Sequence, residues 1–102
     1  MLTIELDASP WRAENDIYNA LLPALGAPHW HGHSLDAMID SVIWGGINAV
    51  EPPYAIHIRG VAKASVGVQE KLKMIKHFFD ESKREFRAAQ NRDVGVELEI
   101  LP

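Results

Sequence analysis

Two carboxylates and three imidazoles stand close together in the segment from Pro28 to Asp40. Asp36 and Asp40 are four residues apart, a spacing that puts both on one side of a helix, about one turn from each other. A like-charge pair at this spacing costs an isolated helix roughly 0.2–0.5 kcal/mol. A sequence that keeps the pair beside Trp30 suggests a surface that meets a cationic partner. The alternative is an ordinary solvated helix face.

The three histidines of this segment suggest a second chemistry, metal binding. His29, His31 and His33 alternate along the chain. Imidazole and carboxylate together suit zinc, nickel or iron, so Asp36 and Asp40 could complete a site. Alternating ligands point the same way only from an extended strand, whereas this loop contains a glycine and precedes a helix. Metal binding, with metal-dependent hydrolysis as its consequence, therefore ranks behind partner binding.

Other catalytic chemistry finds little support in the sequence. Ser34 is the only hydroxyl near the histidines, and capping of the following helix explains it more simply. Gly45 and Gly46 lack the flanking lysine and the preceding strand of a phosphate-binding loop. The two aspartates could separate their pKa values if buried together, but nothing else supplies a substrate cleft. We therefore expect a protein that is not an enzyme and uses no cofactor.

Size and charge narrow the class of protein further. The 102 residues, 47% of them hydrophobic, fit one domain over residues 1–102 with a single core. The absence of cysteine excludes disulfides and thiolate chemistry and fits a reducing cytosol. A net charge of −4 disfavours nucleic acid as the main partner and makes a basic protein the more natural one. No leader peptide or apolar run suggests export or a membrane, so we expect a cytoplasmic protein.

Alternating apolar and polar residues predict three strands, at residues 3–6, 54–58 and 95–101. His57, in the second of them, is expected in the core or at a sheet edge. Helical periodicity separates the strands, so the connections should be right-handed crossovers. The sequence therefore predicts an α/β fold, with a small three-stranded parallel sheet and helices packed against it.

Three helices are expected between these strands. The first begins with Asn15 or Asp16 as its N-cap and ends or kinks near Leu22, because Pro23 interrupts the pattern. The second begins after Ser34, a good N-cap. The third is long, and its apolar face is formed by Val68, Leu72, Ile75, Phe79 and Phe86.

Residues 25–40 resemble the signature of the barstar family, intracellular inhibitors of bacterial ribonucleases. The family pattern has Leu-Pro, two aromatics, a glycine and a polar pair, then Leu-Asp-Ala-Leu and a second Asp one turn on. The order of strands and helices also agrees over nearly the whole chain. The resemblance implies a barstar-like fold and an inhibitor that plugs a ribonuclease active site, its acidic helix and preceding loop taking the place of the RNA phosphates. The residues that match in type and spacing are Pro28, Trp30, Gly32, Leu35, Asp36, Ala37 and Asp40.

The resemblance also assigns roles to residues. Asp40 would be the principal carboxylate facing basic residues of the enzyme, with Asp36 beside it and Trp30 as the loop aromatic. Glu81, two residues after Phe79, matches the third acidic contact of the family, and Glu85 is its rival. The expected partner-binding residues are Trp30, His31, His33, Leu35, Asp36, Ile39, Asp40, Trp44 and Glu81.

Two departures from the family pattern concern the identity of the partner. The family's loop is usually acidic or rich in tyrosine, whereas this one carries three histidines, which weakens the acidic patch. We therefore expect a cognate toxin, with a basic ribonuclease domain, that differs from the family's best-known target. The loop at residues 45–51 is longer than expected and could form a second part of the interface. The free protein is expected to be a monomer that binds neither nucleic acid nor membrane.

Overall fold

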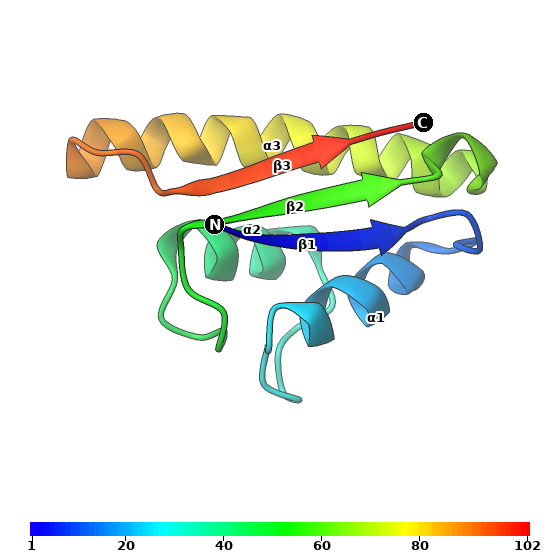
Figure 1. The fold of residues 1–102 in the computed structure, drawn as a ribbon, viewed down its shortest axis with the longest axis horizontal. Helices are drawn as coiled ribbons and strands as arrows, with labels where there is room; N and C mark the ends of the chain where they lie inside the picture. The colour runs from blue at the N-terminus through cyan, green and yellow to red at the C-terminus, as the bar shows by residue number, and fades with distance from the viewer.

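A parallel sheet of three strands forms the front of the molecule in the computed structural model, which describes residues 1–102 (Figure 1). The strands are β1 (Leu2–Asp7), β2 (Tyr54–Arg59) and β3 (Val96–Ile100), in the order β1-β2-β3. Both pairings are parallel, and the strands start level with one another. The predicted α/β class and three-stranded parallel sheet are therefore confirmed, with strand ends shifted by at most one residue.

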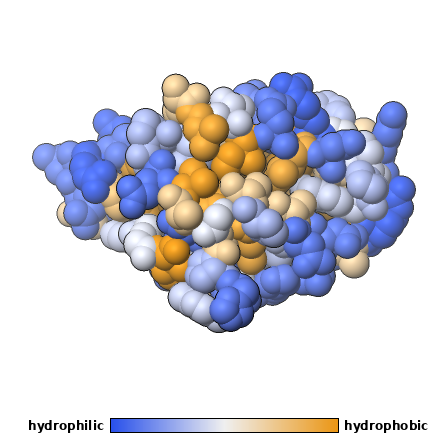
Figure 2. All heavy atoms as spheres, turned by 60° about the horizontal axis from the view of Figure 1, so that its bottom comes forward, coloured by the Kyte–Doolittle hydropathy of each residue, from blue (hydrophilic) through white to orange (hydrophobic).

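Three helices connect and cover the strands. They are α1 (Glu14–Ala24), α2 (Leu35–Trp44) and α3 (Val66–Gln90), and a short 3₁₀ turn (Val61–Lys63) precedes α3. In Figure 1, α3 runs along the length of the molecule behind β3, and α1 and α2 lie towards the β1 side. Figure 2 turns this side forward and shows hydrophobic side chains gathered across the middle of the face, with hydrophilic ones at both ends. None of the helices combines the length and the hydrophobicity of a membrane-spanning segment.

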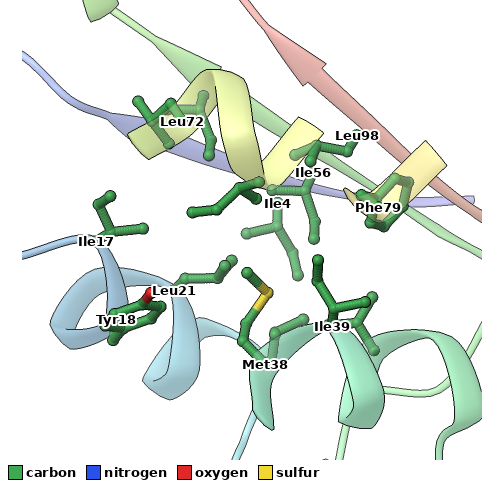
Figure 3. Close-up of a cluster of buried hydrophobic side chains, with 14 of the residues drawn as sticks. Ile4, Ile17, Tyr18, Leu21, Met38, Ile39, Ile56, Leu72, Phe79 and Leu98 are labelled. Atoms are coloured by element: carbon green, nitrogen blue, oxygen red, sulfur yellow. The ribbon is translucent and has the colours of Figure 1, made fainter. Parts of the chain in front are cut away.

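The core lies between the inner face of the sheet and the helices (Figure 3). Alternate side chains of the strands form the sheet's share of the core, as the alternating sequence predicted, although Leu2 at the start of β1 is exposed. All five residues of the predicted apolar face of α3 are buried. The side chains that meet in Figure 3 come from every strand and helix and include Ile4, Ile56, Leu98, Ile17, Tyr18, Leu21, Met38, Ile39, Leu72 and Phe79.

The start of α1 differs from the prediction. The helix begins at Glu14, with Ala13 in the N-cap position, and neither Asn15 nor Asp16 is the cap. Asp16 instead works from inside the first turn, where its Oδ2 accepts the backbone N–H of Arg12 at 2.8 Å and of Ala13 at 3.0 Å. These bonds lower the pKa of Asp16. A carboxylate in the first turn thus replaces a cap side chain that Ala13 lacks.

The end of α1 also differs from the prediction. Pro23 lies inside the helix, which continues to Ala24 instead of ending near Leu22. Proline in the last turn removes only one backbone hydrogen bond, which is a small loss there. The helix closes beyond it: Ala27 N–H donates to Leu22 O at 3.0 Å, and Gly26 N–H to Pro23 O at 3.0 Å. Gly26 takes a φ of 67°, the left-handed conformation that commonly ends a helix.

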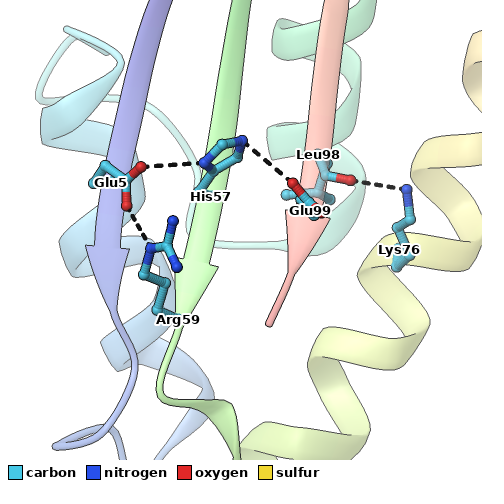
Figure 4. A network of polar contacts seen from close by, with 6 residues as sticks. All are labelled: Glu5, His57, Arg59, Lys76, Leu98 and Glu99. Carbon is cyan, nitrogen blue, oxygen red and sulfur yellow. Dashed lines mark hydrogen bonds and ion pairs between the residues drawn. The ribbon is translucent and has the colours of Figure 1, made fainter. Parts of the chain in front are cut away.

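The outer face of the sheet carries charged side chains (Figure 4). His57 lies there on the central strand β2, half-buried, and so is neither in the core nor at an edge. Its ring nitrogens approach Glu5 at 3.1 Å and Glu99 at 3.4 Å, on the two outer strands. Arg59 adds a 2.7 Å bond to Glu5. This network joins all three strands on the side opposite the helices.

Candidate partner-binding site

Helix α2 presents the two aspartates to solvent. Ser34 caps it as predicted, since its Oγ accepts the Ala37 N–H at 3.1 Å, and Gly45 ends it with a φ of 73°. Asp36 and Asp40 are both exposed, and neither takes part in an ion pair within the chain. Both carboxylates are therefore available to an outside cation.

A groove of about 240 Å³ runs beside these carboxylates, between α2 and α3. Asp36 and Asp40 enter it from α2 and Glu85 from α3, and no lysine or arginine lines it. Half of its lining is hydrophobic, so the three negative groups stand among apolar side chains. A cation that docks here would lose water on binding, which strengthens its attraction to the carboxylates. The lining residues are Leu35, Asp36, Ile39, Asp40, Trp44, Phe78, Ser82 and Glu85.

The two candidates for the third acidic residue are separated by this geometry. Glu85 lines the groove, whereas Glu81 does not. Glu81 instead approaches His77, one turn earlier on α3, at 3.4 Å. The rival residue of the sequence prediction is therefore the one that shares a surface with Asp36 and Asp40.

A second hollow, of about 290 Å³, continues the groove past Asp36 towards α1. Here Glu14 accepts the Tyr18 hydroxyl at 2.7 Å and pairs with Lys71 at 3.4 Å. The Tyr18 bond and the lysine lower the pKa of Glu14, and burial raises the pKa of Tyr18. Because Lys71 is already paired, it leaves the charge of Asp36 largely uncompensated.

A small hollow of about 120 Å³ lies on the other side of Asp40. Trp30, from the loop before α2, and Ile47, from the loop after it, line this hollow together with Asp40. Trp30 is 67% exposed and Ile47 is 40% exposed. Each of the two loops therefore places an apolar side chain beside Asp40.

The three histidines of the loop point to different places. His31 is 6% exposed, and its Nε2 lies 2.8 Å from Ser41 Oγ on α2. His33 is exposed and bonds Asn15 of α1 at 2.7 Å, while His29 is exposed. His31 was expected at the partner surface, but its ring is turned into the protein, where it holds the loop.

This divergence removes the geometry that a metal site in the loop would need. No group of three histidine, aspartate or glutamate side chains is placed to hold a metal ion. His31 uses both ring nitrogens in contacts within the protein, to Gly32 O and Ser41 Oγ. The alternative in which the histidines bind metal together with Asp36 and Asp40 is therefore not supported.

Comparison with known proteins agrees with the fold. The model of the Barstar (barnase inhibitor) family matches residues 1–100. The chain belongs to the barstar family. A search of curated proteins found no match. The family match covers every element of the fold, including the groove between α2 and α3.

Some surface residues of this barstar-family protein were missed by sequence reasoning. Met74 and Phe78, one turn apart on α3, are 47% and 40% exposed beside the acidic groove. The pair Phe78-Phe79 held a signal for this. Phe79 belongs to the core face, and neighbouring helical residues point about 100° apart, so Phe78 had to lie beside the core. Ile47 gave no comparable signal, because loops have no period.

Proposed function

We propose that this protein is an immunity protein that binds a cognate bacterial ribonuclease toxin and occludes its active site. The binding surface is α2, the loop before it and the facing side of α3. The observation that carries the proposal is the groove in which Asp36, Asp40 and Glu85 stand unpaired among apolar side chains. Members of the family are inhibitors rather than enzymes, in keeping with this role.

The chemistry of the groove matches that of a ribonuclease active site. An enzyme that cleaves RNA must hold phosphates, and it does so with lysine and arginine. Three carboxylates on a pair of packed helices offer these cations negative charge, as the RNA phosphates do, but they contain no phosphodiester bond that the enzyme could cleave. The net charge of −4 also favours fast encounter with a basic partner at low salt.

The proposed contacts fall into two kinds. Asp40, Asp36 and Glu85 supply the charge, with Glu85 in place of Glu81. Aromatic and aliphatic side chains around them, of which Ile39 is buried, exclude water from the ion pairs, as in other interface centres. His31 acts from inside the loop and makes no direct contact. The residues proposed to contact the partner around the three carboxylates are Trp30, His33, Leu35, Ile39, Trp44 and Phe78.

The partner proposed here differs from barnase. The loop brings imidazoles where the family usually has acidic groups or tyrosines, and Ile47 adds an apolar contact from the long loop after α2. These changes alter both charge and shape beside Asp40. The expected target is a basic ribonuclease domain encoded next to this chain, inhibited in the cytosol by the monomer.

The test is a binding experiment with that neighbouring ribonuclease domain, using Asp40→Asn. Loss of a charge-assisted contact of about 1.5–3 kcal/mol weakens binding by roughly 10- to 150-fold. Asp40→Asn should also flatten the salt dependence of the association rate. Glu70→Gln is the matched control, because Glu70 is exposed on α3, forms no ion pair and lies outside the groove. Equal affinity of Asp40→Asn and wild type would remove the acidic helix from the mechanism.

A further inference from the structure

Apart from apolar and aromatic residues, His31 and Ser41 are the only buried residues of this protein, and they contact each other. His31 belongs to the loop before α2, whereas Ser41 lies on α2, directly after Asp40. Buried polar groups are normally retained only where they are hydrogen-bonded, so a pair of this kind fixes a particular arrangement of the chain.

Ser41 also binds the loop that follows α2. Asn48 Nδ2 donates to Ser41 Oγ at 3.1 Å, and His31 Nε2 lies 2.8 Å from the same oxygen. One hydroxyl thus holds both loops that flank the acidic helix. We refer to His31, Ser41 and Asn48 as the clasp.

The contact between His31 and Ser41 can form with either side chain as the donor, and the one unpaired buried atom of the clasp is Asn48 Oδ1. The Nδ1 atom faces Gly32 O at 2.8 Å, so it carries a proton and donates. With neutral His31, the Ser41 hydroxyl donates to Nε2. With protonated His31, Nε2 donates to Ser41, whose proton then turns to Met38 O at 3.1 Å. Either direction of the His31–Ser41 hydrogen bond therefore keeps the link between loop and helix.

The two exposed apolar residues of the 120 Å³ hollow each stand directly before a clasp residue in the sequence. Trp30 precedes His31, and Ile47 precedes Asn48. Both apolar side chains line the 120 Å³ hollow with Asp40, yet each is too exposed to be held by its own packing. Their polar neighbours anchor them instead, from inside the protein.

We propose that the clasp preforms this hollow as a receptor for one basic side chain of the partner. The charged end would bond Asp40, while the methylene stem would pack against Trp30 and Ile47. The site rests on the proposed function, since its occupant comes from the same ribonuclease. Ser41 is then a positioning residue: it contacts no partner atom, and it prolongs the complex because the hollow needs no ordering on binding.

The first arm of the test uses the free protein and the variant Ser41→Ala. Hydrogen exchange is followed at the amides of His31, Ala49 and Val50, which come from the two loops and all donate to backbone carbonyls between α1 and α2. Without the hydroxyl, these amides should exchange about 10-fold faster than in wild type. The matched control is Val68→Ala, a buried truncation on α3, which should leave the loop amides less affected. Equal acceleration in both variants would overturn the clasp.

The second arm measures the complex with the ribonuclease domain encoded next to this chain. Ser41→Ala should raise the dissociation rate about 10-fold and leave the association rate and its salt dependence unchanged, because no charge is altered. Asn48→Ala should act similarly, and the double variant should add little, because both act through one hydroxyl. If Ser41→Ala does not fold, Asn48→Ala replaces it in both arms of the test.

The two arms separate this inference from the proposed function. Faster exchange with an unchanged dissociation rate would overturn the receptor, since the loops would then be loosened without effect on the partner. A complex insensitive to Asp40→Asn would instead contradict the proposed function. The receptor would be supported if the loop amides exchange faster only in the clasp variants and the complexes of these variants also dissociate faster.

Discussion

The indole of Trp44 packs on the ring of Phe86, with centroids 5.1 Å apart and planes inclined at 56°. The contact joins the last residue of α2 to α3 at one end of the acidic groove. Phe86 is buried, while Trp44 stays 45% exposed. The exposed face of Trp44 is therefore held rigidly, next to Asp40 and Glu85 in the groove lining.

Trp44→Ala and Trp30→Ala should differ in folding stability, because only Trp44 packs on another aromatic ring of the protein. Trp44→Ala loses its packing on Phe86, which costs about 0.5–1.5 kcal/mol of folding stability. Trp30 has no such stacking partner, so Trp30→Ala should change stability by less than about 0.5 kcal/mol. Urea unfolding measures this difference. In binding to the ribonuclease, each variant should lose more than about 1 kcal/mol, and full affinity of either would exclude that indole from the interface.

Glu85→Gln and Glu81→Gln should differ in binding although both remove one negative charge from α3. Glu85 lies in the groove with Asp36 and Asp40, whereas Glu81 approaches His77. We expect about 10-fold weaker binding for Glu85→Gln, the value of one charged contact, and little change for Glu81→Gln. Titration calorimetry with the same ribonuclease sample compares them. A larger loss in Glu81→Gln would restore the residue that the family pattern suggested.

Glu81 and Glu85 also show where sequence reasoning reaches its limit. They are four residues apart and share one side of α3, so helical spacing alone cannot choose between them. The choice depends on where α2 crosses α3, which is a property of the packed core. The faces of α2 and α3 themselves were predictable, because buried residues recur with the helical period.

The loop before α2 sets a similar limit. Trp30, His31 and His33 read as neighbouring surface residues, yet the ring of His31 is buried and the other two side chains are exposed. A loop has no period that tells inside from outside. The partner of His31 is Ser41, ten residues away, whose polar side chain on the apolar side of α2 was the one available signal.

Glu5→Gln should change the response of stability to acid. Bonds from Arg59 and His57 lower the pKa of Glu5 in the folded protein (Figure 4). A lowered folded pKa gives stability that is present above the unfolded value, near 4.5, and is lost as the pH falls through the folded value. The variant should therefore be less stable than wild type at about pH 5, and the two should converge towards about pH 3.

Chemical denaturation at these two pH values measures the effect of Glu5→Gln. Glu70→Gln is the control, since Glu70 is an exposed carboxylate with no ion pair. It should follow the wild-type profile at both pH values. A constant difference between Glu5→Gln and wild type would contradict the link to protonation, because it would show a loss that is independent of the carboxylate's charge.

Gly26→Ala should destabilise the protein, whereas Gly67→Ala should stabilise it. Gly26 has a φ of 67°, and an added Cβ would lie 2.7 Å from the Cβ of Ala49, in the loop after α2. Left-handed strain and this clash together should cost about 1–3 kcal/mol. Gly67 lies in the first turn of α3 with open space around it, so alanine there should add about 0.4–1 kcal/mol. The thermal midpoint should fall for Gly26→Ala and rise for Gly67→Ala. Equal shifts in the two variants would show that stability does not depend on the close approach of Gly26 to Ala49.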